Sequence, residues 1–169
     1  MHGLINALEF LGNVHHFGAA IIAGGCARDA YFHRVPKDFD IMVPKGFPMN
    51  SLKEAYRDSL RGQFMMYDST DPDTADRVID VLKFSFKGTD IDVIRYNVEY
   101  AEDCPNHFDA NLNQFVLGTD GVPRFVGTQH PDKGLKFIRE VRQTRQEYIE
   151  NKCADISYRD WETDRKSVV

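Results

Sequence analysis

The first hydrophobic residues of the chain recur with the spacing of one helix face: Leu4, Ile5, Leu8 and Leu11. This pattern predicts a helix that ends at Gly12-Asn13. The short apolar run 19–23 then predicts a buried strand that stops at Gly24-Gly25, and a short helix is expected over 28–32.

The next segment alternates with a period of two, with Phe39, Ile41 and Val43 on one side and Asp38, Asp40 and Met42 on the other. This alternation predicts a strand packed on one face. A helix is expected over 51–60, and the polar, turn-rich run 68–75 is expected to be a loop.

Two hairpins with a glycine in each turn are expected, 78–86 with 91–96 and 114–117 with 122–126. A final helix is predicted over 132–150. The order of elements is typical of an α+β fold with a mixed sheet flanked by helices, and it differs from a repeating βαβ pattern. Residues 1–150 are expected to form one domain. The tail 151–169 is expected to be unstructured, and its end resembles a translated sequencing adapter, a scar.

Composition narrows the function classes. The chain has 169 residues, 42% of them hydrophobic, and a formal net charge of −5, which disfavours a dedicated basic scaffold for nucleic acid. It contains no apolar run long enough to span a membrane and no visible secretory signal, and no membrane partner is expected. Its three cysteines are widely spaced, which argues against a disulfide framework or a zinc ribbon and favours a cytoplasmic setting.

The turn Gly24-Gly25 is the first candidate for chemistry. A strand that ends in two glycines before a helix lets backbone N–H groups approach a phosphate, and Arg28 would add a bidentate contact. The alternative is a tight structural turn in which Arg28 pairs with Asp29.

Asp38 and Asp40 share one face of their predicted strand, because side chains alternate along a strand. Asp92 on a later strand offers a third carboxylate, with Asp90 as the alternative third acid. Carboxylates that converge from two strands suit two Mg²⁺ ions and the in-line displacement that such ions promote. The alternative is a pair of solvated acids on an edge strand.

Gly-Gly-x-x-Arg-Asp at 24–29, followed by Asp38-Phe39-Asp40, resembles the nucleotidyltransferases of the DNA polymerase beta superfamily. More narrowly, it resembles the head domain of tRNA CCA-adding enzymes and bacterial poly(A) polymerases, in a small stand-alone form of the phage type. The resemblance implies a polymerase-beta-like fold, a triphosphate held by Gly24, Gly25 and Arg28, and two Mg²⁺ ions held by the catalytic residues Asp38, Asp40 and Asp92.

The segment 108–113 resembles the Asp-Phe-Thr-x-Asn segment of that family, which implies that Asp109 and Asn113 bind the nucleotide near its ribose. The basic stretch 133–145 is similar to the start of the family's neck helix, and Lys136 and Arg139 are candidates for nucleotide binding. Lys133 and Lys136 stand where that family carries an acidic residue and an arginine that select the base, so CCA specificity is not expected.

These inferences predict a Mg²⁺-dependent nucleotidyltransferase that moves a nucleoside monophosphate (NMP) from a nucleoside triphosphate (NTP) to an acceptor hydroxyl, with an RNA 3′ end as the expected acceptor. Two alternatives stay open. One is transfer to a protein or a small molecule, and the other is a nucleotide-binding module without catalysis.

Overall fold

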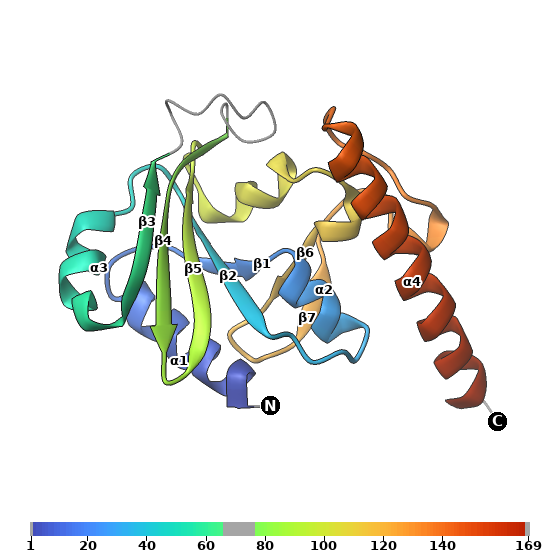
Figure 1. Ribbon diagram of the computed structural model, residues 1–169, viewed down its shortest axis with the longest axis horizontal. Helices are drawn as coiled ribbons and strands as arrows, with labels where there is room; N and C mark the ends of the chain where they lie inside the picture. Colours follow the sequence, from blue (N-terminus) through green and yellow to red (C-terminus); the bar gives the residue numbers. More distant parts are fainter. Residues whose placement is uncertain (1, 66–76, 168–169) are drawn as a thin grey trace.

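A seven-stranded mixed sheet organises the protein, in the order β3-β4-β5-β2-β1-β6-β7 (Figure 1). The computed structural model describes residues 2–65 and 77–167. The strands are β1 (Ile21–Ala23), β2 (Asp38–Val43), β3 (Leu60–Met65), β4 (Val78–Phe86), β5 (Thr89–Tyr96), β6 (Phe115–Leu117) and β7 (Pro123–Phe125). The paired strands are antiparallel except β2 and β5, which run parallel. The prediction of an α+β fold with a mixed sheet is confirmed.

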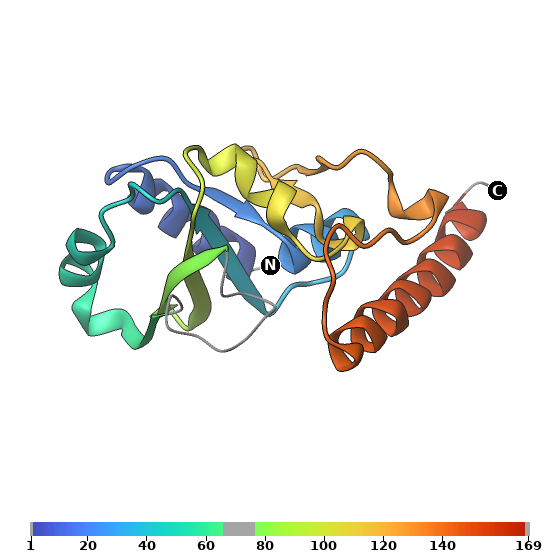
Figure 2. The ribbon, with the colours of Figure 1, turned by 90° about the horizontal axis from the view of Figure 1, so that it is seen from above.

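The described residues also form four α-helices, which lie around the sheet: α1 (His2–His15), α2 (Gly25–Tyr31), α3 (Met49–Ala55) and α4 (Gln143–Ser167). Short 3₁₀ turns lie at Arg57–Ser59, Ala101–His107, Asn111–Asn113 and Pro131–Lys133. Helix α1 crosses one face of the sheet, and α4 lies at the opposite end of the molecule from α3, as the two views show (Figures 1 and 2). Within the described part of the chain, no helix is both long and apolar enough to cross a membrane.

Alternation along the strands separates the core from the candidate site. On β2, Phe39 and Ile41 point into the main hydrophobic cluster, where they join Phe10 and Val14 of α1. All four side chains are at most 1% exposed, and each contributes roughly 2 kcal/mol by burial. The acidic residues of β2 therefore face the other side of the sheet.

Both predicted hairpins are present. β4 and β5 pair along their whole length, and their turn uses positive φ angles at Lys87 (51°) and Gly88 (82°). β6 and β7 pair in the same way around a turn with Gly121 at φ 78°. Glycine tolerates such angles without steric cost.

The segment predicted as a helix over 51–60 differs in its second half. Helix α3 ends at Ala55, a 3₁₀ turn follows, and the chain enters β3 at Leu60. β3 was not predicted. Its residues are exposed or half-buried, so the strand lacks the buried apolar face that gives a signal in the sequence. The predicted loop 68–75 lies outside the described residues.

The prediction of one helix over 132–150 is wrong in its first half. Residues 131–133 form a 3₁₀ turn, Gly134 takes φ 122°, and α4 begins only at Gln143. The intervening segment is extended instead: Phe137 forms a β-bridge with Ala110. Gly134, which lies inside the predicted helix, adopts a positive φ angle that ends helical geometry. The chain after it pairs with the backbone at Ala110.

The prediction of an unstructured tail is also wrong, because α4 continues from Gln143 to Ser167. Ile149 and Ile156 are 1% and 2% exposed and pack with Ala110 and Leu112. A long helix with two buried isoleucines is therefore part of the fold, and the predicted boundary at residue 150 falls inside it.

Candidate functional site

The predicted Gly24-Gly25 turn joins β1 to α2 and does require glycine. Gly24 has φ 91°, and its N–H donates to the Phe115 carbonyl at 2.9 Å. A Cβ on Gly25 would lie 3.2 Å from Nη2 of Arg28. The turn therefore leaves room for the Arg28 guanidinium to fold back over the backbone.

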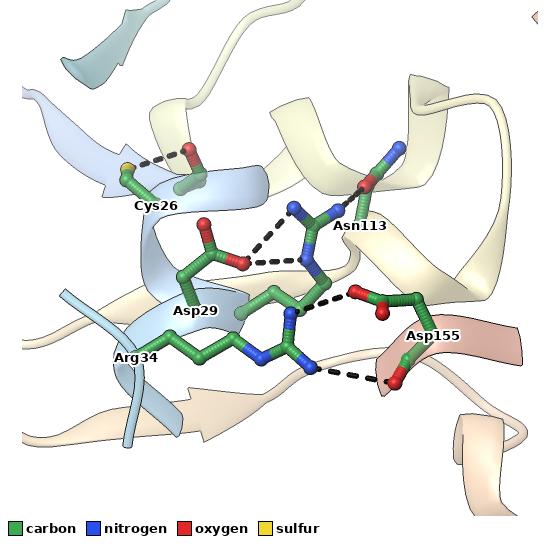
Figure 3. A network of polar contacts seen from close by, with 7 residues as sticks. Cys26, Asp29, Arg34, Asn113 and Asp155 are labelled. Carbon is green, nitrogen blue, oxygen red and sulfur yellow. Dashed lines mark hydrogen bonds and ion pairs between the residues drawn. The ribbon is translucent and has the colours of Figure 1, made fainter. Parts of the chain in front are cut away.

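Arg28 is buried and fixed on two sides. Its Nε donates to Oδ1 of Asp29 at 3.1 Å, and its Nη1 donates to Oδ1 of Asn113 at 2.8 Å (Figure 3). The structural alternative from the sequence, a pair with Asp29, is thus present. The contact of Arg28 with Asn113 places Asn113 next to the glycine turn. The turn, Arg28 and Asn113, all predicted to bind the nucleotide, thus lie together.

The three predicted catalytic carboxylates meet across the parallel pair of strands. In the register of β2 and β5, Asp40 stands opposite Asp92 and Asp38 stands opposite Asp90. Directly paired residues project from the same face of a sheet. Asp38, Asp40, Asp90 and Asp92 therefore form an acidic face, on the side of the sheet away from α1.

The pKa of Asp40 is raised by its position on this face. Burial, followed by the charge of Asp92, raises its pKa from 3.8 to about 7, with a further contribution from Asp38, while Lys83 opposes the shift. A carboxyl group with a raised pKa holds a proton or attracts a cation near neutral pH. A bound cation would therefore stabilise the charged form of Asp40.

The raised pKa predicts how stability depends on pH without metal. Below about pH 3.8, Asp40 is protonated in both the folded and the unfolded state, so it does not lower the free energy of unfolding. Between pH 3.8 and about 7, only the unfolded state releases the proton, so the free energy of unfolding falls as the pH rises. Compared with Asp40→Asn in EDTA, the wild-type protein should lose roughly 3 kcal/mol between pH 4.5 and 8. Thermal melts of both proteins at the two pH values measure this difference. A constant difference between the two proteins would contradict it.

Asp92 is already paired with cations. Nζ of Lys83 lies 2.8 Å from its Oδ2, and Nη2 of Arg61 lies 3.3 Å from its Oδ1. Arg61 also contacts Oδ1 of Asp90 at 3.3 Å through Nε. By position, Asp92 is the one next to Asp40, and Arg61 bridges Asp90 and Asp92. The assignment of Asp92 as the third carboxylate stays a prediction.

A cavity of about 280 Å³ connects the glycine turn to the acidic face. Its wall contains Gly24, Gly25, Arg28, Asp40, Asp109 and Asn113, together with apolar side chains of the strands. Tyr96 and Phe108 belong to this wall, and their ring centroids are 5.9 Å apart. Sequence elements that are far apart along the chain thus surround one cavity with both cationic and anionic groups.

Asp109 does not offer a free carboxylate to this cavity. It is 4% exposed; its Oδ1 accepts from Nη2 of Arg77 at 2.9 Å and its Oδ2 accepts from Nε of Arg145 at 3.0 Å. Arg77 also donates to the His107 carbonyl at 2.7 Å. Asp109 therefore holds two arginines at the cavity: Arg77, which directly precedes β4, and Arg145 of α4.

Two predicted residues lie elsewhere. Lys136 and Arg139 belong to the extended segment before α4 and are not among the residues that line the cavity. The cavity instead contains Arg77, Arg145 and Tyr148, which the sequence did not single out as a group. Arg145 had been noted only as one of several cations, and nothing in the sequence places Arg77 beside Asp109.

The acidic face supplies the oxygen ligands that Mg²⁺ prefers. Within the part of the chain that the structure describes, Asp38 and Asp40, two residues apart on β2, form no ion pair, and the raised pKa of Asp40 favours a cation there. Among the described residues, no group of three or more acidic, histidine or cysteine side chains is arranged closely enough to hold an ion. A divalent ion would thus be held by two carboxylates, Asp38 and Asp40, together with substrate phosphates and water, while Asp92 is engaged by Lys83 and Arg61.

Comparison with known proteins extends the fold assignment. No family model matches the sequence, and no curated protein matches it. Among solved structures, the chain is similar to the crystal structure of the Bacillus stearothermophilus CCA-adding enzyme in complex with CTP, with a TM-score of 0.55 and 13% sequence identity. The match covers 83% of this chain and 34% of that enzyme, so the chain spans about a third of its length. The protein has a nucleotidyltransferase-like fold.

Proposed function

We propose that this chain is a Mg²⁺-dependent nucleotidyltransferase that transfers an NMP from an NTP to the 3′ hydroxyl of an RNA. The acceptor oxygen forms a bond to the α-phosphorus, the bond from that phosphorus to the bridging oxygen of the β-phosphate breaks, and pyrophosphate leaves. The hydroxyl proton is released as the new bond forms.

The register of β2 and β5 carries this proposal, because it places the acidic face beside the cavity that also contains Gly24, Gly25 and Arg28. Carboxylates next to a cationic, glycine-lined cavity suit a polyphosphate held together with its metal ion. A purely structural acidic pair would not need a cavity at this position. The fold similarity to an enzyme whose structure contains CTP is consistent with an NTP as the ligand.

Each residue then has a role. Asp38 and Asp40 would hold Mg²⁺, which supplies charge stabilisation at the phosphate oxygens. Arg28, fixed by Asp29 and Asn113, orients the triphosphate. Catalysis in this arrangement consists of positioning and of electrostatic stabilisation, with no covalent intermediate on the protein.

The proposal is tested by incubating the protein with each α-³²P-labelled NTP in turn, Mg²⁺ and a pool of small RNAs, followed by a denaturing gel. CTP and ATP are the first nucleotides to try, since the structural neighbour is a CCA-adding enzyme with CTP bound. The expected result is label on RNA that disappears in EDTA, and the NTP used gives the base preference.

Other outcomes assign a different function. Label on a protein or on a small molecule, with none on RNA, would keep the reaction and replace the acceptor. NTP binding without transfer to any acceptor in Mg²⁺ or Mn²⁺ would contradict the enzymatic proposal and favour a nucleotide-binding module. The pairing of Asp92 with Lys83 is the observation that favours this second candidate.

A further inference from the structure

Three side chains form one row across three neighbouring strands. Asp40 of β2 stands opposite Asp92 of β5, and Asp92 stands opposite Lys83 of β4. Cross-strand partners share a face of the sheet, so the ammonium group of Lys83 belongs to the same surface as the two carboxylates. The row ends in a fixed positive charge that the protein itself supplies.

The position of Lys83 is defined by several contacts. Its Nζ lies 2.8 Å from Oδ2 of Asp92 and 5.7 Å from the ring centre of Phe64 on β3. The other oxygen of Asp92 contacts Arg61 at 3.3 Å. The side chains of Lys83 and Asp92 are 35% and 22% exposed, so the pair is partly shielded from solvent and its attraction is stronger than that of a fully exposed pair.

These contacts matter for metal binding because Mg²⁺ and Mn²⁺ need carboxylate oxygens at about 2.0–2.2 Å with nearly ideal octahedral geometry. Both oxygens of Asp92 already face a cationic nitrogen. A divalent ion on Asp92 would have to displace Lys83 or lie beside it, and the two positive charges would repel each other. Among the described residues, the ion pairs of Arg61 and Lys83 are formed with Asp90 and Asp92, and neither Asp38 nor Asp40 has a cationic nitrogen in ion-pair contact.

We infer that Lys83 takes the place of a second cation, so that the acidic face binds one divalent ion, on Asp38 and Asp40, and Asp92 acts by positioning Lys83. This inference rests on the proposed function and departs from the pair of ions that the sequence predicts. In this arrangement the ammonium group of Lys83 supplies, beside Asp92, the positive charge that a second ion would bring to the row.

Counting bound ions tests the inference directly. Mn²⁺ is titrated into the full chain saturated with a non-hydrolysable NTP analogue, and electron paramagnetic resonance measures the concentration of free Mn²⁺. A parallel titration of the analogue without protein measures how many ions the analogue binds by itself. The wild-type protein should bind one ion on its own residues, and Lys83→Met should bind two, because Oδ2 of Asp92 becomes available while Arg61 keeps its contact with Oδ1. In the double variant Lys83→Met/Asp92→Asn, which keeps the charge of the row, one ion should bind with a Kd within about threefold of the wild-type value.

Lys87→Met is the matched control. Lys87 lies on the β4–β5 turn, where its Nζ contacts Glu9 at 2.8 Å, and its replacement should leave the count at one. Circular dichroism and melting curves establish that each variant is folded.

Failure of the inference and failure of the proposed function give different results. Two ions in the wild-type protein, or one ion in Lys83→Met, would overturn the inference and leave nucleotidyl transfer in place. No ion bound by the protein's own residues, together with no labelled product from any NTP, would overturn the proposed function itself.

Discussion

Asp38→Asn is expected to lower the rate of nucleotidyl transfer by about 10³-fold while leaving the melting temperature unchanged. Charge stabilisation by a metal ion contributes several kcal/mol at the transition state, and each ~1.4 kcal/mol corresponds to a factor of ten. Asp38 is exposed at the start of β2 and makes no contribution to the hydrophobic core, so its replacement should not disturb folding.

The measurement is the initial rate of α-³²P incorporation under saturating NTP, with melting curves of both proteins. Asp120→Asn is the control, because Asp120 is half-exposed in the β6–β7 turn and pairs with Arg124 at 2.9 Å, away from the cavity wall. The control should keep the wild-type rate. An Asp38→Asn protein with more than a tenth of the wild-type rate would be incompatible with a metal ion on Asp38 and Asp40.

Asp109→Asn is expected to be the most destabilising single change at the site, with a loss of about 3 kcal/mol in the free energy of unfolding. The carboxylate is 5% exposed and pairs with Arg77, which is 9% exposed, and with Arg145. An asparagine would remove the carboxylate that pairs with the buried guanidinium of Arg77 at 2.9 Å. The same change releases Arg145 of α4 from the cavity, so the Kd for NTP should rise at least about tenfold.

Denaturant unfolding and equilibrium NTP binding measure the two effects. Asp155→Asn is a matched control, because Asp155 also ties α4 to the rest of the protein through Arg34 at 3.1 Å, but its side chain is 43% exposed. An exposed ion pair contributes at most about 1 kcal/mol, so this variant should be nearly as stable as the wild-type protein. Equal losses in both variants would show that the Asp109 pairs are no stronger than a surface contact.

The role of Asp109 illustrates where sequence reasoning succeeds and where it stops. Its resemblance to a nucleotide-binding position predicted that it belongs to the site, and it does line the cavity with Asn113. Its partners could not be predicted, because Arg77 and Arg145 lie 32 and 36 residues away along the chain. Pairing over such separations depends on the fold as a whole and leaves no periodic signal.

For the acidic face, too, one part could be predicted from the sequence and another could not. Alternation along β2 predicted that Asp38 and Asp40 share a face, since this follows from the geometry of a single strand. The presence of Lys83 in the same row depends on the register of β4 against β5, which a sequence specifies only through its turn and its buried face. The hairpin was predicted, but the pairing of Lys83 with Asp92 was not read from it.

The segment before α4 was predicted least well. A helix was predicted over 132–150, yet Phe137 forms a β-bridge with Ala110. The side chain of Asn111 stabilises this arrangement: its Nδ2 donates to the Gly134 carbonyl at 2.9 Å and its Oδ1 accepts from the Lys136 N–H at 2.9 Å. A buried asparagine with several backbone partners overrides local helix propensity, and this explains why Lys136 lies outside the cavity.

The central claim is that the cavity beside the acidic face transfers the α-phosphoryl group of an NTP together with its nucleoside. The most direct measurement compares two labels on the same nucleotide, α-³²P and γ-³²P, in parallel reactions with Mg²⁺ and RNA. The account predicts that only the α label becomes attached to RNA, while the γ label leaves as pyrophosphate in equal amount. Attachment of the γ label would indicate a kinase-type reaction and would contradict the account, as would the release of both labels without any attachment.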